Sequence, residues 1–128
     1  MKIDIVNSGF EDLLFIRVKG KIYLENAIST INDYYSNPDF NNIIWDFRNG
    51  SSQTMSYCDF KTIANIAQRH NSHCPGRNIY FIVNKSREHS LLKIYVNIAS
   101  AINNAIRYSI SDAVELPEDL HNAMPLLS

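Results

Sequence analysis

The sequence has two cysteines, almost no net charge and no long hydrophobic run, and each shortage excludes a class of protein. Cys58 and Cys74 are too few for a disulfide framework and form no Cys-x-x-Cys pair, which predicts reduced thiols in a cytoplasmic protein. No apolar run approaches the roughly 20 residues of a membrane span, and the charges of Lys2 and Asp4 argue against a signal peptide. A net charge of −1 gives no field that favours nucleic acid.

Motifs of nucleophilic catalysis and of nucleotide binding are missing as well. The chain has no Gly-x-Ser-x-Gly elbow, and its Lys85-Ser86-Arg87 segment lacks the glycine spacing of a phosphate-binding loop. His70, His73 and Cys74 form a single local group, whereas zinc needs three or four convergent ligands. We therefore expect a protein that is not an enzyme and that holds no metal or other cofactor.

Apolar patterns and turn formers predict one soluble α/β domain over residues 1–128, of which 45% are hydrophobic and 20% charged. Strands are expected at residues 2–6, 12–19, 42–47, 79–83 and 106–110. Helices are expected at 24–36, 56–70, 87–104 and from Pro117 to about Met124. The order β-β-α-β-α-β-α-β-α predicts a single mixed, mostly parallel five-stranded sheet with helices on its faces.

Local patterns specify three of these elements further. The run 79–83 has no polar alternation, which predicts a central strand covered on both faces, whereas 106–110 alternates as an edge strand does. Ser56 and Asp59 have capping-box spacing at the start of the helix 56–70.

This pattern resembles the STAS fold, and within it the SpoIIAA-like group of bacterial proteins. The resemblance is carried by Val18-Lys19-Gly20-Lys21 and the helix after Tyr23, then by Ile44-Trp45-Asp46-Phe47 with its Arg48-Asn49-Gly50-Ser51 loop, and by the buried strand 79–83. It covers roughly residues 12–120. It implies a regulatory or binding domain without enzymatic activity, which acts through a protein partner or a small ligand.

The resemblance also points to a phosphorylation site. STAS proteins that regulate sigma factors carry a phosphorylatable serine in an Asp-Ser-Ser-Gly-like motif where the helix after the Asp-ended strand begins. Here the matching region, Gln53-Thr54-Met55-Ser56-Tyr57, supplies Ser56 but not the preceding acid, the second serine or the glycine. Ser56 is thus either a phosphorylation site or only a helix cap.

Two strand ends carry the candidate binding residues, which are Asp46, Arg48, Ser51, Ser52, Lys85, Ser86 and Arg87. Asp46 would bind a cation, orient a ligand, or close an Asx-type turn on the amides of Asn49 or Gly50. The segment 85–87 opens a helix, where backbone amides and two cations would hold an anion or a lipid head group, unless it is simply a solvated helix start. Because ligand sites lie beyond the carboxyl ends of parallel strands, segments 46–52 and 84–87 predict one binding face.

Two further hypotheses come from other functional classes. A lipid or apolar small-molecule carrier would need a cavity beneath the helix 87–104. An enzyme would need at least two convergent polar groups near Asp46. A homo-oligomer is compatible with each of these readings.

Overall fold

The computed structural model describes residues 2–6 and 9–112, which form five strands and three helices in the order β1-β2-α1-β3-α2-β4-α3-β5. The strands are β1 (Lys2–Val6), β2 (Leu13–Lys21), β3 (Asn42–Ser51), β4 (Asn78–Ile82) and β5 (Arg107–Ser111). The helices are α1 (Leu24–Tyr34), α2 (Tyr57–Asn71) and α3 (Ser86–Ile102). The predicted α/β class with one mixed sheet is confirmed, and the helix expected after Pro117 lies outside the described residues.

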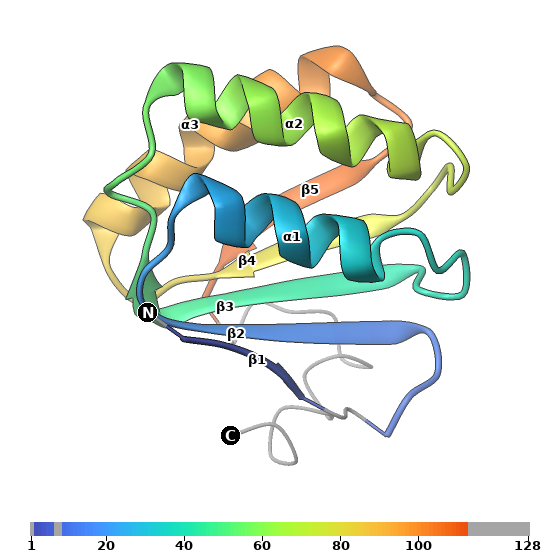
Figure 1. The fold of residues 1–128 in the computed structure, drawn as a ribbon, viewed down its shortest axis with the longest axis horizontal. Coiled ribbons are helices and arrows are strands. Elements are labelled where there is room, and N and C mark those ends of the chain that lie inside the picture. The colour runs from blue at the N-terminus through green and yellow to red at the C-terminus, as the bar shows by residue number, and fades with distance from the viewer. Residues whose placement is uncertain (1, 7–8, 113–128) are drawn as a thin grey trace.

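The strands lie side by side in their sequence order, β1-β2-β3-β4-β5. β1 pairs antiparallel with β2, while the pairs β2–β3, β3–β4 and β4–β5 are parallel. All three described helices lie on one side of the sheet (Figure 1), rather than on both faces. The strand order explains this difference, because right-handed crossovers that always step in one direction place every helix on the same face.

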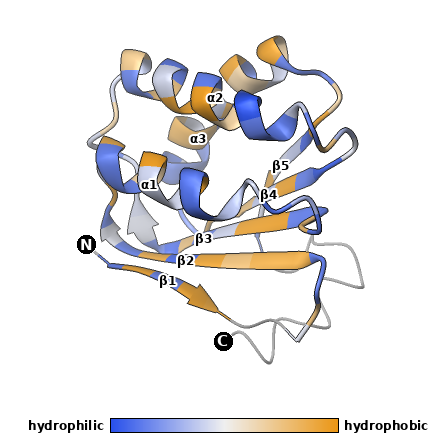
Figure 2. Ribbon diagram, turned by 45° about the vertical axis from the view of Figure 1, so that its right-hand side comes forward, coloured by the Kyte–Doolittle hydropathy of each residue, from blue (hydrophilic) through white to orange (hydrophobic). Residues whose placement is uncertain are grey.

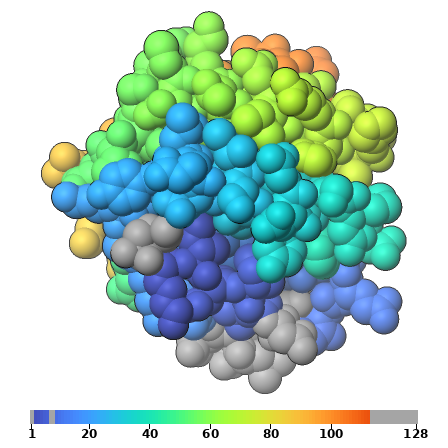
Figure 3. All heavy atoms as spheres, viewed as in Figure 1, coloured from blue at the N-terminus to red at the C-terminus, as the bar shows by residue number. Residues whose placement is uncertain are grey.

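Two apolar layers form on the two faces of the sheet. The larger lies between the sheet and the helices and includes Trp45 and Phe47 of β3. The smaller lies on the opposite face, where Phe15 and Ile44 are fully buried. β2 and β3 contribute to both layers, which accounts for their long hydrophobic stretches in Figure 2. In the space-filling view, α1 lies across the front of the molecule between α2 and β1 (Figure 3).

The predicted cap of α2 is confirmed. The Ser56 Oγ accepts a hydrogen bond from the Asp59 amide at 3.1 Å, and the Asp59 carboxylate accepts one from the Ser56 amide at 3.0 Å. This capping box satisfies two backbone amides that the helix itself cannot pair. It fixes the point at which the chain turns from the β3 loop into α2.

A bulge alters the path of β3 just after Asp46. Arg17 pairs with Asp46, but Lys19 pairs with Asn49, so β3 has one extra residue opposite Val18. The strand then continues to Ser51, and the expectation that it ends at residue 47 is wrong. The polar residues 48–51 had indicated a loop, yet residues 49–51 pair with residues 19–21 of β2.

The bulge brings the backbones of β2 and β3 very close at Gly50. A Cβ atom at this position would lie 2.8 Å from both the carbonyl oxygen and the Cγ1 of Val18. Only glycine leaves room for this approach.

A buried arginine holds the opposite end of the helical layer. Arg77 is 1% exposed and precedes β4. Its guanidinium donates to the carbonyl oxygens of Tyr35, Asn37 and Phe40 and to Oδ1 of Asn71, at 2.8–3.2 Å. Tyr35 and Asn71 lie at the C-terminal ends of α1 and α2, where the helix dipole favours a cation, and Asn37 and Phe40 lie in the loop after α1. Arg77 therefore ties two helix ends to the sheet.

Candidate functional site

All three described helices begin at the same end of the sheet, beyond the carboxyl ends of β2, β3 and β4 (Figure 1). The segments there are residues 21–24, 51–57 and 83–88, and together we call them the rim. In parallel sheets this end is where ligands usually bind. The rim includes five of the seven candidate binding residues that were predicted from the sequence.

A buried hydrogen-bond pair joins two rim segments. The Ser52 amide donates to Oε1 of Glu88 at 2.8 Å, and the Ser52 hydroxyl donates to Oε2 at 2.5 Å. Ser52 is 2% exposed and Glu88 is 5% exposed. Glu88 lies in the first turn of α3, where the helix dipole stabilises its negative charge. The structure thus brings together the β3 and β4 ends, through a glutamate that sequence reasoning missed.

The third rim segment is joined to the β3 end by its backbone. The Ile22 amide donates to the Ser51 carbonyl at 2.9 Å, and the Thr54 hydroxyl donates to the Ile22 carbonyl at 2.5 Å. The loops that precede α1, α2 and α3 are therefore cross-linked to one another. These hydrogen bonds fix the backbones of the three loops relative to one another.

The outer surface of the rim combines aromatic and cationic side chains. Tyr23, the N-cap of α1, is 47% exposed, and Tyr57, the first residue of α2, is 62% exposed. Lys85, Ser86 and Arg87 are exposed at the start of α3, and the Lys85 N-cap makes no side-chain capping bond. The rim thus presents large contact groups on a cross-linked backbone.

Asp46 and Arg48 lie on the other face of the sheet. Strand alternation places Asp46 on the side of Ile44, opposite the helices that cover Trp45. The Asp46 carboxylate, which is 3% exposed, accepts from Nε and the terminal guanidinium nitrogen of Arg48 at 2.9 and 2.8 Å. These hydrogen bonds raise the pKa of the Arg48 guanidinium. The two residues are separated from Ser52 and from residues 85–87 by the sheet.

The Asx-type turn expected at Asp46 is present, but on a different amide. Oδ1 of Asp46 accepts from the Arg48 amide at 3.0 Å, not from Asn49 or Gly50. The reason is the bulge, because residues 49–51 stay in register with β2. Arg17 lies at 3.8 Å on the neighbouring strand and adds a second cation to this carboxylate. Asp46 is thus held by an internal ion-pair network.

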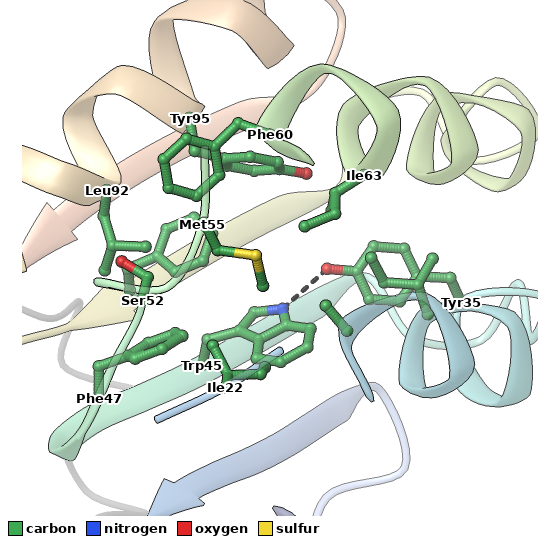
Figure 4. A pocket seen from close by; sticks show the side chains of 13 residues that line it. Ile22, Tyr35, Trp45, Phe47, Ser52, Met55, Phe60, Ile63, Leu92 and Tyr95 are labelled. Atoms are coloured by element: carbon green, nitrogen blue, oxygen red, sulfur yellow. Dashed lines mark hydrogen bonds between the residues drawn. The ribbon is translucent and has the colours of Figure 1, made fainter. Parts of the chain in front are cut away.

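A small cavity lies between the sheet and the helices (Figure 4). Its volume is about 40 Å³, and its lining is almost wholly apolar. On one side Nε1 of Trp45 donates to the Tyr35 hydroxyl at 2.8 Å, and burial raises the pKa of Tyr35. Leu92 and Tyr95 of α3 close another side. This volume accommodates a water molecule or a small gas, whereas pockets for drug-sized ligands measure roughly 300–1,000 Å³.

The remaining candidate groups have ordinary local partners. Nε2 of His70 lies 3.1 Å from Oδ1 of Asn32, and burial with the nearby Arg77 charge lowers the pKa of His70. Among residues 2–6 and 9–112, no group of three His, Cys, Asp or Glu side chains is placed to hold a metal ion. In the same ranges, no helix has the length and hydropathy needed to cross a membrane.

Comparison with known proteins gives no family assignment. No protein-family model matches the sequence, and no curated protein matches it significantly. The likeness to STAS domains consequently stays a proposal that depends on element order and short local patterns. Phosphorylation of Ser56 stays a prediction too, although this exposed serine does serve as the predicted helix cap.

Proposed function

We propose that this chain is a non-enzymatic regulatory domain, similar to STAS and SpoIIAA-like proteins, which binds a protein partner through the rim. The observation that carries this proposal is the exposure of Tyr23, Tyr57 and Arg87 on three cross-linked segments. Tyrosine and arginine are enriched among the residues that contribute most to protein interfaces. A rim whose loops are already ordered loses less conformational entropy on binding.

The order of elements supports the STAS-like part of the proposal. An antiparallel hairpin opens the sheet, and three parallel crossovers follow, with α1, α2 and α3 on one face.

The internal hydrogen bonds of the candidate polar side chains favour a binding role over catalysis. Ser52, Ser56 and Asp46 each make internal hydrogen bonds that serve the fold.

The alternative function, a lipid or apolar small-molecule carrier, receives less support. Such a carrier needs a cavity beneath α3, and the cavity lined by Leu92 and Tyr95 measures about 40 Å³. A lipid chain would enter only if α3 moved away from Phe60 and Phe81. The ring centroids of these two residues lie 5.8 and 5.9 Å from that of Tyr95 on α3. Partner binding at the rim requires no such opening.

Affinity capture from native lysate tests the proposal. We expect the immobilised protein to retain a protein partner, and Arg87→Glu to reduce that retention at least tenfold, because it reverses a charge on the exposed rim. Arg107→Glu is the matched control, since Arg107 is also an exposed cation but lies at the start of β5.

Equal retention by the wild-type protein and Arg87→Glu would refute the rim as the binding surface. Lipid in the eluate, at one molecule per chain and with no protein partner, would favour the carrier instead.

A further inference from the structure

A shallow groove runs along the outer side of α2 and α3. It is open to solvent and has a volume of about 500 Å³. Its apolar lining includes Tyr57 of α2 and Ile94, Ile98, Ala101 and Ile102 of α3. Six large hydrophobic side chains are exposed in the described part of the chain, and three of them, Tyr57, Ile94 and Ile102, line this groove. Exposed apolar side chains that cluster in this way mark interaction surfaces.

The groove exists because α3 is apolar on two of its faces. One stripe, which includes Leu92, Tyr95 and Ala99, is buried against the sheet and α2. A second stripe, Ile94, Ile98, Ala101 and Ile102, follows helical spacing on another face and faces the groove. The core accounts for the first stripe only. The second has the pattern of a helix surface that packs against one more element.

The charges around the groove have one sign. Lys61 lines the groove, and Lys93 lies one helical turn before Asn97, another residue of its lining. Both lysines are exposed, and within the described residues neither makes a salt bridge. The two acidic residues of α2 and α3 are already engaged. Asp59 accepts from the Ser56 amide, and the buried Glu88 accepts from Ser52. The edges of the groove are therefore cationic, and α2 and α3 themselves supply no unengaged carboxylate to compensate them.

We propose that this groove binds an amphipathic helix of a partner protein, with apolar side chains at i, i+3 or i+4 and i+7 seated on Tyr57, Ile94 and Ile102. Acidic side chains beside that apolar stripe would face Lys61 and Lys93. A helix fits better than an extended peptide, because an added strand needs an open sheet edge, whereas the groove walls are side chains of two helices. The inference rests on the proposed function only in treating the chain as a protein-binding domain.

Designed peptides test this inference with the whole 128-residue chain. The probe is a fluorescent 18-residue helix with leucine at i, i+3, i+4 and i+7 and glutamate on both flanks. One comparison peptide has lysine flanks, and another has the same composition without the apolar stripe. We expect fluorescence anisotropy to show at least tenfold tighter binding of the glutamate-flanked helix than of either comparison peptide.

Variants locate the binding surface. Ile94→Glu should weaken binding at least tenfold, because it places a carboxylate in the apolar floor and repels the acidic flanks. Lys61→Glu should weaken the binding of the glutamate-flanked helix and strengthen the binding of the lysine-flanked helix. Ile5→Glu on β1 is the control, since Ile5 is 38% exposed, close to the 41% of Ile94, but lies outside the groove. Far-ultraviolet circular dichroism checks that each variant is folded.

Four results would overturn the inference. Equal binding of all three peptides would remove the specificity, and unchanged affinity in Ile94→Glu would place the contact elsewhere. A wild-type dimer that Ile94→Glu converts to monomer in sedimentation would assign the groove to a second copy of the chain. Partner capture that fails in Arg87→Glu but not in Ile94→Glu leaves the rim proposal standing while the groove proposal fails.

Discussion

Replacing the buried Arg77 by methionine tests whether this guanidinium, which forms no ion pair with a carboxylate of residues 2–6 and 9–112, stabilises the fold. Methionine keeps much of the apolar length of the side chain but removes every donor. The carbonyl oxygen of Tyr35 and Oδ1 of Asn71 are buried acceptors, and both would lose their hydrogen bonds to Arg77. The acceptors on Asn37 and Phe40 are only partly buried and would recover water.

The expected loss follows from these two buried acceptors. An unsatisfied buried polar group costs about 1–3 kcal/mol, so the pair costs about 2–6 kcal/mol. Removing the cation also removes the cost of its burial, which lowers the net loss. We expect Arg77→Met to reduce the free energy of unfolding by about 3 kcal/mol, out of a total of about 5–15 kcal/mol for a domain of this size.

Urea unfolding measures this change directly. The single tryptophan, Trp45, is 4% exposed and reports the tertiary structure by fluorescence, while circular dichroism reports the helices. Arg77→Lys keeps the charge but not the fork of donors, and its loss should be intermediate. A loss below about 1 kcal/mol in Arg77→Met, or a gain in stability, would refute the reasoning, because the burial cost of the cation would then equal or exceed the value of its hydrogen bonds.

Two further predictions concern the sheet. Gly50→Ala should destabilise the protein by about 1–3 kcal/mol, because its Cβ would lie 2.8 Å from the Val18 carbonyl oxygen; an unchanged urea midpoint would mean that the bulge relaxes freely. Burial raises the pKa of Tyr108 to about 12, so stability that is fully present below pH 10 should fall as the pH rises from 10 to 12. In Tyr108→Phe, the slope of the unfolding free energy against pH should be smaller by up to the contribution of one proton. Identical slopes in the wild-type protein and Tyr108→Phe would contradict the assignment to Tyr108.

The elements that sequence reasoning located well depend on local patterns. The start of α2 is set by Ser56 and Asp59, which are three residues apart and bond to each other. The hydrophobic run of β4 can likewise be recognised from its own residues. The bounds of α2 and β4 were both predicted to within one residue.

The elements that it missed depend on distant partners. β3 continues through polar residues because residues 19–21 of β2 pair with them, and nothing within residues 48–51 signals that register. Glu88 bonds to Ser52, and Arg77 bonds to Phe40, across 36 and 37 positions of sequence. The division of Asp46 and Ser52 between opposite faces depends on the bulge. A single sequence therefore locates the strands, but not the distant pairing that extends β3 to Ser51 or the faces on which its side chains lie.

The hydrogen bond between Trp45 and Tyr35 places the single tryptophan where its fluorescence can report on folding. The sheet forms from partners far apart in the chain, since β2 pairs with β3 and β3 with β4 only after a helix has intervened. Such non-local pairing is slow compared with helix formation, which takes about a microsecond or less. Trp45 lies where α1 meets the middle of the sheet, so its emission should change when these layers dock. Intrinsic fluorescence will therefore report when α1 docks on the sheet, while circular dichroism reports when the helices form.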